Sequence, residues 1–149
     1  MQFTTVALAL FGTAMAAPAA IQARQGAQED ANITEFSVHK NAGNAVDGVS
    51  FNLLSGAAGH NIVCNANADK VHGLPTSMID CGDASYHFMV LAGSDATTFT
   101  LRLYHDANGV ADGIFGHVDI ATFCHAGGAG TYACMQEKPA SVHLDNSPK

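Results

Sequence analysis

The segment TTFTLRLY, residues 97–104, carries the clearest structural pattern in the sequence. Its apolar and polar side chains alternate strictly, so that Phe99, Leu101 and Leu103 would share one face and the threonines and arginine the other. This period of two is typical of a half-buried β-strand. A turn-forming run, DANG at residues 106–109, follows it, and a return strand is expected over residues 114–120. The segment therefore predicts an antiparallel hairpin.

The same alternation recurs on both sides of this hairpin. Val49, Phe51 and Leu53 alternate with polar neighbours, and the run YHFMVL at residues 86–91 predicts a strand that is apolar on both faces. Four shorter segments are further strand candidates: Ile33 to His39, Asn61 to Cys64, Thr131 to Met135 and Ala140 to Leu144.

Glycines, 15 in all, separate these segments. Beyond the amino-terminal residues no window shows a helical stripe, although ANADKV at residues 66–71 is compatible with a single helical turn. Many short strands joined by glycine-rich turns favour one all-β domain, a small antiparallel β-barrel or sandwich.

Residues 1–16 are predicted to form a cleavable signal peptide. The apolar run FTTVALALFGTAM, residues 3–15, is shorter than the about 20 residues that span a bilayer. Ala14, Met15 and Ala16 form the small-x-small pattern of signal peptidase sites, which places the cut between Ala16 and Ala17. A buried N-terminal helix is the alternative. The protein is therefore expected to be secreted and extracellular.

The remaining boundaries follow from composition. Residues 17–31 are expected to be a disordered leader, in which a second cut after Arg24 is an open alternative to a plain flexible tail. The β domain is expected to span residues 32–144, and residues 145–149 to form a frayed tail.

The cysteines, four in number, are Cys64, Cys81, Cys124 and Cys134. Export makes them oxidisable, and an even count predicts two disulfides with none left for a covalent dimer. Three pairings exist in principle, of which the local one closes two short loops. Zinc is the alternative, but the sequence lacks the C-x-x-C pairs common in zinc sites. We expect a monomer or a weak non-covalent dimer.

Charge excludes two classes of partner. The formal net charge is −7, and the basic residues are scattered, whereas nucleic-acid binding needs clustered lysines and arginines. The same acidity argues against an anionic membrane surface, and no later run is apolar enough for membrane insertion.

Catalytic motifs are absent from the sequence, which lacks G-x-S-x-G, H-E-x-x-H and P-loop patterns. The histidines could in principle form a metal site or a pH sensor, but their spacing favours individually solvated or hydrogen-bonded rings: His39, His60, His72, His87, His105, His117, His125 and His143. Most of the candidate carboxylates lie in expected turns: Asp80, Asp83, Asp106, Asp112 and Asp119. We therefore expect no enzyme activity, no metal and no cofactor.

Asn32-Ile33-Thr34 is an N-glycosylation sequon. It lies just before the first expected strand and should be accessible, so Asn32 is a candidate glycan acceptor.

The most specific segment is FCHAGGAGTYAC, residues 123–134, in which glycines fill a short loop between two cysteines. With ITEF at residues 33–36, the Cys64-x-Ala66-x-Ala68-Asp69 run and Cys81-Gly82, it resembles the fungal Alternaria major-allergen family. The resemblance spans about residues 33–136.

This resemblance implies an antiparallel β-barrel-like fold with local disulfides, secretion by ascomycete fungi, and an allergen, elicitor or effector role that provokes plant defence. The implied partners are host plant proteins, either thaumatin-like defence proteins or a surface receptor, and the implied location is the host apoplast if the source is a plant-associated fungus. Carriage of flavonoid-like ligands, or inhibition of a host defence protein, is the alternative. No member is established as an enzyme.

Two departures from the family pattern stand out. Some relatives carry an extra cysteine that joins two subunits, which is missing here, and Met78, Ile79 and Asp80 stand where relatives often have an aromatic residue before the second cysteine. Both weaken the case for a ligand site at a dimer interface.

The expected recognition surface consists of three loops, residues 82–85, 106–113 and 125–131. A carrier would instead need a pocket lined by aromatic and aliphatic side chains from the expected strands: Phe88, Phe99, Leu101 or Phe115. In small barrels such side chains usually fill the interior.

Overall fold

The computed structural model describes residues 27–107 and 113–146. Several sequence predictions lie outside these residues: the signal peptide with its cleavage site at Ala16–Ala17, the second cut after Arg24, Asp112, and residues 147–149 of the expected tail. The strands are β1 (Gln28–Lys40), β2 (Val46–Ser55), β3 (Asn61–Ala66), β4 (Ile79–Asp80), β5 (Tyr86–Ala92), β6 (Thr98–His105), β7 (Ile114–Ala126), β8 (Tyr132–Gln136) and β9 (Ala140–Asp145). A short 3₁₀ helix, η1 (Gly128–Gly130), lies between β7 and β8. Among the described residues no helix could cross a membrane.

All strand pairs are antiparallel, in the order β3-β2-β1-β8-β7-β6-β5-β4. The long strands β1 and β7 are bridged by two short strands placed end to end. β9 pairs with residues 28–33 of β1, and β8 pairs with residues 37–40. Both short strands also contact β7.

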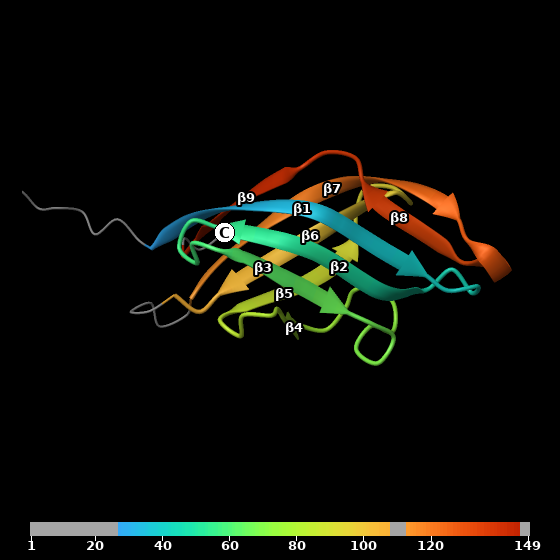
Figure 1. The fold of residues 1–149 in the computed structure, drawn as a ribbon, viewed down its shortest axis with the longest axis horizontal. Coiled ribbons are helices and arrows are strands. Elements are labelled where there is room, and N and C mark those ends of the chain that lie inside the picture. The colour runs from blue at the N-terminus through green and yellow to red at the C-terminus, as the bar shows by residue number, and fades with distance from the viewer. Residues whose placement is uncertain (1–26, 108–112, 147–149) are drawn as a thin grey trace, which may run out of the picture.

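The sheet curls until its two halves face each other across a common interior (Figure 1). The ring of Phe51 on β2 lies 5.1 Å from that of Phe88 on β5, edge to face, and Phe36 on β1 lies 6.1 Å from Phe99 on β6. Such aromatic contacts bury large apolar areas and favour tilted geometry. The interior is therefore a packed core.

A disulfide joins the two edge strands of this curled sheet. Cys64 on β3 is bonded to Cys81, which directly follows β4, and Gly82 N–H donates to the carbonyl of Val63 at 2.8 Å. Because unpaired strand edges are templates for aggregation, this seam both fixes the curl and protects the edges. The prediction of an antiparallel β-barrel or sandwich with two local disulfides is confirmed.

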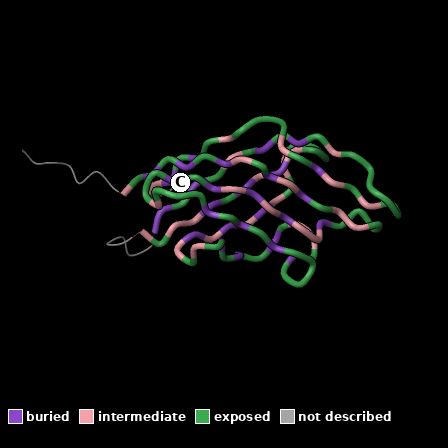
Figure 2. Tube along the Cα trace, viewed as in Figure 1, coloured by how far each residue is buried: buried purple, intermediate pink, exposed green. Residues whose placement is uncertain are grey.

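Burial follows the alternation that the sequence predicts, as the changing colours along each strand show (Figure 2). Every inward residue named for residues 49–53, 86–90 and 99–103 is at most 3% exposed. At about 25 cal/mol per Å² of buried apolar surface, this core is the main source of stability.

Several boundaries differ from expectation. β1 begins at Gln28, so residues 28–31 belong to the domain and not to a leader; Ala31 is 1% exposed and pairs with Ser55 and Val142. β9 includes Asp145, and β7 continues to Ala126. The two-residue strand β4 was not predicted, because no alternation is visible in so short a segment. The expected turn over residues 66–71 is present, with Val71 N–H donating to Asn67 C=O.

Candidate functional site

A concave site of about 640 Å³ lies at one end of the curled sheet. Its walls come from the start of β1, the turn after β2, the loop before β5 and the residues after β6. The lining side chains include three carboxylates, Glu29, Asp30 and Asp83, together with His105 and several alanines. Strand ends and loops on a rigid sheet are where binding groups usually gather.

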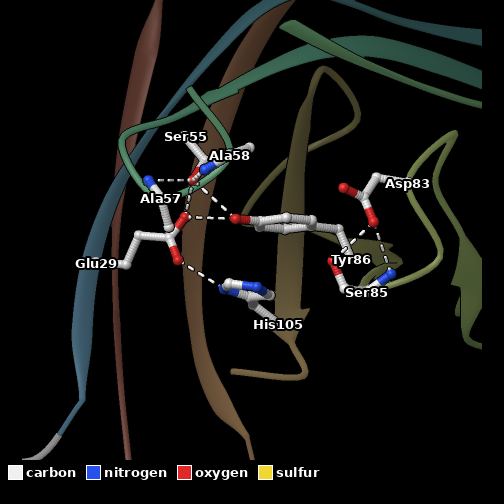
Figure 3. A network of polar contacts seen from close by, with 8 residues as sticks. All are labelled: Glu29, Ser55, Ala57, Ala58, Asp83, Ser85, Tyr86 and His105. Atoms are coloured by element: carbon white, nitrogen blue, oxygen red, sulfur yellow. Dashed lines mark hydrogen bonds and ion pairs between the residues drawn. The ribbon is translucent and has the colours of Figure 1, made fainter. Parts of the chain in front are cut away.

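Glu29 forms the buried centre of this site (Figure 3). Its side chain is 5% exposed. Oε1 accepts hydrogen bonds from the hydroxyls of Tyr86, at 2.9 Å, and Ser55, while Oε2 lies 2.6 Å from Nδ1 of His105. A carboxylate removed from water is costly unless it is paired and hydrogen-bonded. Three partners from three other strands meet this need.

Ser55 and Tyr86 extend the network. Ser55 Oγ accepts from Ala57 N–H and Ala58 N–H at 3.1 and 3.2 Å, which shapes the turn after β2, and lies 2.8 Å from the Tyr86 hydroxyl. Burial raises the pKa of Tyr86 to about 12, and the hydrogen bond to Glu29 acts in the same direction. The phenol therefore stays a donor throughout the physiological range.

Tyr86 and His105 are direct partners on β5 and β6, and their rings stack 4.0 Å apart at 12°. Stacking on Tyr86 fixes the plane of the His105 imidazole, and the contact with Glu29 fixes the position of its Nδ1. No hydrogen bond engages Nε2 among the described residues. A His105 held in this way presents one ring nitrogen for a ligand to contact.

The loop before β5 closes the site on one side. The carboxylate of Asp83 accepts from Ser85 N–H at 3.0 Å and from the Ser85 hydroxyl at 2.7 Å, which lowers the pKa of Asp83. This is a local side-chain turn of the kind that aspartate commonly forms. Asp106 N–H donates to the carbonyl of Ser85 at 2.9 Å, which ties this loop to the end of β6.

A second polar cluster lies at the start of β5, on the face of the strand opposite to Tyr86. His87 places Nδ1 2.7 Å from Asp80 and Nε2 3.1 Å from Asp106. Hydrogen bonds to Asp106 and Asp80 raise the pKa of His87 against the opposing effect of burial. Only the doubly protonated ring can donate to both carboxylates.

The cysteines pair locally, Cys64 with Cys81 and Cys124 with Cys134. The second disulfide links direct partners on β7 and β8. These pairings confirm what the family resemblance implied, and the local pairing is the one of the three that the structure contains.

Residues 33–134, which contain all four cysteines, match the family model described as Alternaria alternata allergen 1. The chain belongs to this family. Effector protein PevD1 of Verticillium dahliae is 38% identical over 156 aligned positions, covering 99% of this chain and 96% of that protein. The same protein from strain VdLs.17 matches equally.

Two solved structures of family proteins share the fold. The crystal structure of Alternaria alternata allergen Alt a 1 superimposes with a TM-score of 0.60 at 22% identity, over 77% of this chain and 86% of that one. A second crystal structure of the same allergen gives a TM-score of 0.57 at 24% identity, over 80% and 95%.

Within this Alternaria allergen 1 domain, Asn32 lies inside β1 and not before it. Its side chain is exposed, and its Oδ1 accepts from the Ser141 hydroxyl at 2.7 Å. Glycosylation of Asn32 stays a prediction.

The three expected recognition loops do not form one surface. The loop at residues 82–85 contacts the start of the loop at 106–113, most of which lies outside the described residues. The segment 125–131 includes the last two residues of β7 and lies at the far end of that strand, which has 13 residues and is thus about 40 Å long. The domain therefore has two separate loop ends.

The four carrier residues share no cavity among those found in the described part of the chain. Phe88 and Leu101 are fully buried in the core. Phe99 lines a hollow beside Lys40, and Phe115 faces outward beside Tyr104. The pocket that a carrier needs is not formed by these side chains.

Five of the histidines bond individually to protein oxygens: His39, His60, His87, His105 and His143. No cluster of three or more candidate metal ligands forms in residues 27–107 and 113–146. Two of the candidate carboxylates lie on strands and not in turns, Asp80 on β4 and Asp119 on β7. Asp119 accepts a hydrogen bond from the Thr100 hydroxyl at 2.5 Å.

Sequence reasoning missed Glu29 as a site residue. Glu29 occupies an inward position of β1, in alternation with Ala31 and Ile33. The alternation of inward residues, continued from Ile33 towards the N-terminus, would have indicated that Glu29 points inward. A charged residue at that position, however, argued against a buried strand.

Proposed function

We propose that the protein is a secreted fungal effector that contacts plant proteins outside the host cell and triggers or modulates defence. The similarity to effector protein PevD1, 38% identity over 99% of this chain, carries the proposal. The match covers 99% of this chain and 96% of that protein, so it spans the whole β domain and both of its loop ends. The Alternaria allergen 1 family membership supports secretion in the same way.

The architecture suits a protein that acts by contact and without chemistry of its own. Two disulfides and the β3–β4 seam limit local opening, which is the step on which proteolysis depends. A domain of this kind can persist among extracellular proteases while its two loop ends remain accessible.

Infiltration of the purified full-length secreted product into leaves tests the proposal. We expect an oxidative burst or local cell death at micromolar protein, which buffer and an unrelated disulfide-bonded secreted protein should not cause. Unaltered tissue across several plant species, with intact disulfides verified by mass spectrometry, would refute the elicitor role.

A matched pair of substitutions locates the recognising end. Ala84 and Ala126 are both exposed alanines, one before β5 and the other at the end of β7. Ala84→Arg and Ala126→Arg therefore add the same side chain at opposite ends. If one loop end is recognised, one variant should lose the response and the other retain it.

Thaumatin-like defence proteins are the first partner class to examine, with a plant surface receptor as the second. Surface plasmon resonance between the immobilised protein and a purified thaumatin-like protein should show saturable binding that Ala84→Arg or Ala126→Arg abolishes. If no binding occurs while leaves still respond, a thaumatin-like protein is not the partner.

A further inference from the structure

A row of paired side chains crosses the outer face of the sheet. Phe123 on β7 pairs with Met135 on β8, and Met135 pairs with Ser37 on β1. Ser37 pairs with Ser50 on β2, which pairs with Asn65 on β3. Because directly paired residues point to the same face, these five side chains form one line, here called the cross-strand row.

The row faces solvent. Phe123 is 66% exposed and Met135 56% exposed, and Asn65 is also exposed. The two serines are half-buried. Its sequence neighbours point inward: Phe36 and Cys64, for example, are fully buried. The row therefore joins an apolar end on β7 and β8 to a polar end on β1, β2 and β3.

The surface is hollowed along this row. A concave area of about 750 Å³ includes Ser37, Ser50 and Asn65 in its lining, and another of about 510 Å³ includes Ser37 and Met135. The two hollows meet at Ser37. Gly48 lies beside the row, where a Cβ would stand 3.2 Å from Cβ of His39. The surface is therefore concave where Gly48 and the two small serines lie between larger side chains.

The five side chains of the row carry no charge, although the two hollows are also lined by charged residues of both signs: Asp47, Asp69, Lys70, Glu35, Glu137 and Lys138. The polar groups of the row are two hydroxyls and an amide, and Ser37 Oγ and Ser50 Oγ lie 2.9 Å apart in one shared hydrogen bond. Each oxygen keeps further lone pairs, and the amide of Asn65 both donates and accepts. The aromatic ring of Phe123 offers an exposed apolar platform.

These features match the two sides of a sugar ring. Ring hydroxyls donate and accept hydrogen bonds, and the C–H face of a pyranose packs on an aromatic ring. The row crosses four strand intervals of about 4.8 Å, so it extends about 19 Å, which accommodates a short extended oligosaccharide. The row itself offers no charged group to a ligand. Carboxylates outnumber lysines around the two hollows, and the net charge of the chain is −7, so acidic polymers are disfavoured.

We propose that the cross-strand row binds an uncharged, extended, β-linked glycan chain that lies across β7, β8, β1, β2 and β3. A sugar stacks on Phe123 and Met135, and hydroxyls of later units bond to Ser37, Ser50 and Asn65. A second copy of the chain is a poorer occupant, because an apolar partner surface would leave the amide of Asn65 and one serine O–H donor without hydrogen-bond partners. This proposal stands independently of the effector role.

Isothermal titration of the full secreted chain with three hexasaccharides tests the proposal: chitohexaose, cellohexaose and a β-1,3-glucan hexamer. The first represents the fungal wall and the second the plant wall. We expect saturable binding of at least one. Phe123→Ala should weaken it at least tenfold, and Ser50→Val, which keeps the shape and removes the hydroxyl, should weaken it severalfold.

Phe115→Ala is the matched control. Phe115 lies on the same strand, is 36% exposed, and is eight residues from Phe123 along β7. This variant should bind as tightly as the parent, and circular dichroism should show all three variants folded. Absence of binding at millimolar hexasaccharide, or binding equal in Phe123→Ala and the parent, would overturn the proposal. So would a concentration-dependent dimer, seen by sedimentation, that Phe123→Ala dissociates.

Discussion

Gln136 on β8 hydrogen-bonds to the backbone of Phe36 on β1, with Oε1 accepting from Phe36 N–H at 3.0 Å. Its Nε2 donates to the carbonyl of Ile33 at 3.2 Å. The register of β1 shifts between Thr34 and Ser37, where Glu35 has φ = 55° and the strand changes partner from β9 to β8. One side-chain amide thus replaces the ladder bonds that are missing at this bulge.

We predict that Gln136→Leu lowers the free energy of unfolding by about 1–3 kcal/mol, because it leaves a partly buried backbone donor and acceptor without partners. Urea denaturation followed by circular dichroism measures this loss. Gln136→Glu keeps the acceptor for Phe36 and loses only the donor to Ile33, so its cost at neutral pH should be smaller. Equal stability of the leucine variant and the parent would show that the amide is dispensable.

The two disulfides should differ in how much they contribute to the stability of the fold. Loop-closure entropy assigns each about 3 kcal/mol. Cys124 and Cys134 are also held together by the β7–β8 ladder, whereas Cys64 and Cys81 join edges with a single backbone hydrogen bond between them. The double substitution Cys64→Ala and Cys81→Ala should therefore destabilise the protein more than Cys124→Ala with Cys134→Ala.

Hydrogen exchange locates this difference. Removal of the seam disulfide should accelerate exchange in β3 and in the segment that leads to β4, while the core of β6 and β7 stays protected. Removal of the Cys124–Cys134 disulfide serves as the matched control and should accelerate exchange at the end of β7 and in β8. Uniform acceleration by both double variants would contradict a seam held by Cys64–Cys81.

We predict that ionisation of Tyr86 lowers the free energy of unfolding in alkaline solution. Its pKa is raised from 10.0 to about 12 in the folded state, so the native protein binds more protons than the unfolded chain in this range. Stability attributable to Tyr86 is full below pH 10 and falls between pH 10 and 12, by at most about 3 kcal/mol. Spectrophotometric titration should show one tyrosine that ionises later than an ordinary phenol.

Tyr86→Phe should remove this late titration and flatten the alkaline part of the stability curve. At neutral pH it should also cost about 1–3 kcal/mol, because Glu29 and Ser55 lose a partner in a buried site. Tyr104→Phe changes a half-buried tyrosine on β6 and is the control. If the late phase survived in Tyr86→Phe, the phenol would not be the group responsible.

His87 should stabilise the fold most in acid. Its folded pKa is raised above 6.5, mainly through the hydrogen bond to Asp106 and also through Asp80. The stabilisation is therefore complete below the unfolded value of 6.5 and is lost as the pH rises through the folded pKa. Proton NMR of the imidazole C–H resonances should place its midpoint above that of an ordinary histidine.

Asp106→Asn should lower the His87 midpoint and reduce the slope of stability against pH above 6.5. Asp69→Asn removes an equal charge from the exposed turn after β3 and should leave the midpoint in place. An identical midpoint in the parent and in Asp106→Asn would disprove the role of Asp106.

The strands that the sequence predicts best are those with an uninterrupted period of two. Phe99, Leu101 and Leu103 are inward and buried as expected, because alternation maps directly onto the two faces of a strand. β4 and the first residues of β1 were not predicted, for two different reasons. Ile79–Asp80 is too short to show a period, and Glu29 places a carboxylate where a half-buried strand normally has an apolar side chain.

The candidate site depended on contacts that no local pattern encodes. Glu29 and His105 are separated by 76 positions, and Tyr86 reaches Glu29 across 57. Sequence spacing carries no sign of such a meeting, since it is set by the curl of the sheet and the register between β5 and β6. The same holds for the cross-strand row, whose members come from five strands.

The sequence by itself determined the all-β class, the inward faces of the long strands and the family, because each of these depends on local alternation or on short motifs. Tertiary structure alone decided the ends of β1, the side-chain bridge of Gln136 and the network around Glu29. These features arise where strands distant in sequence are brought together by burial of a common core. Their partners are chosen by register and curvature and not by neighbouring residues.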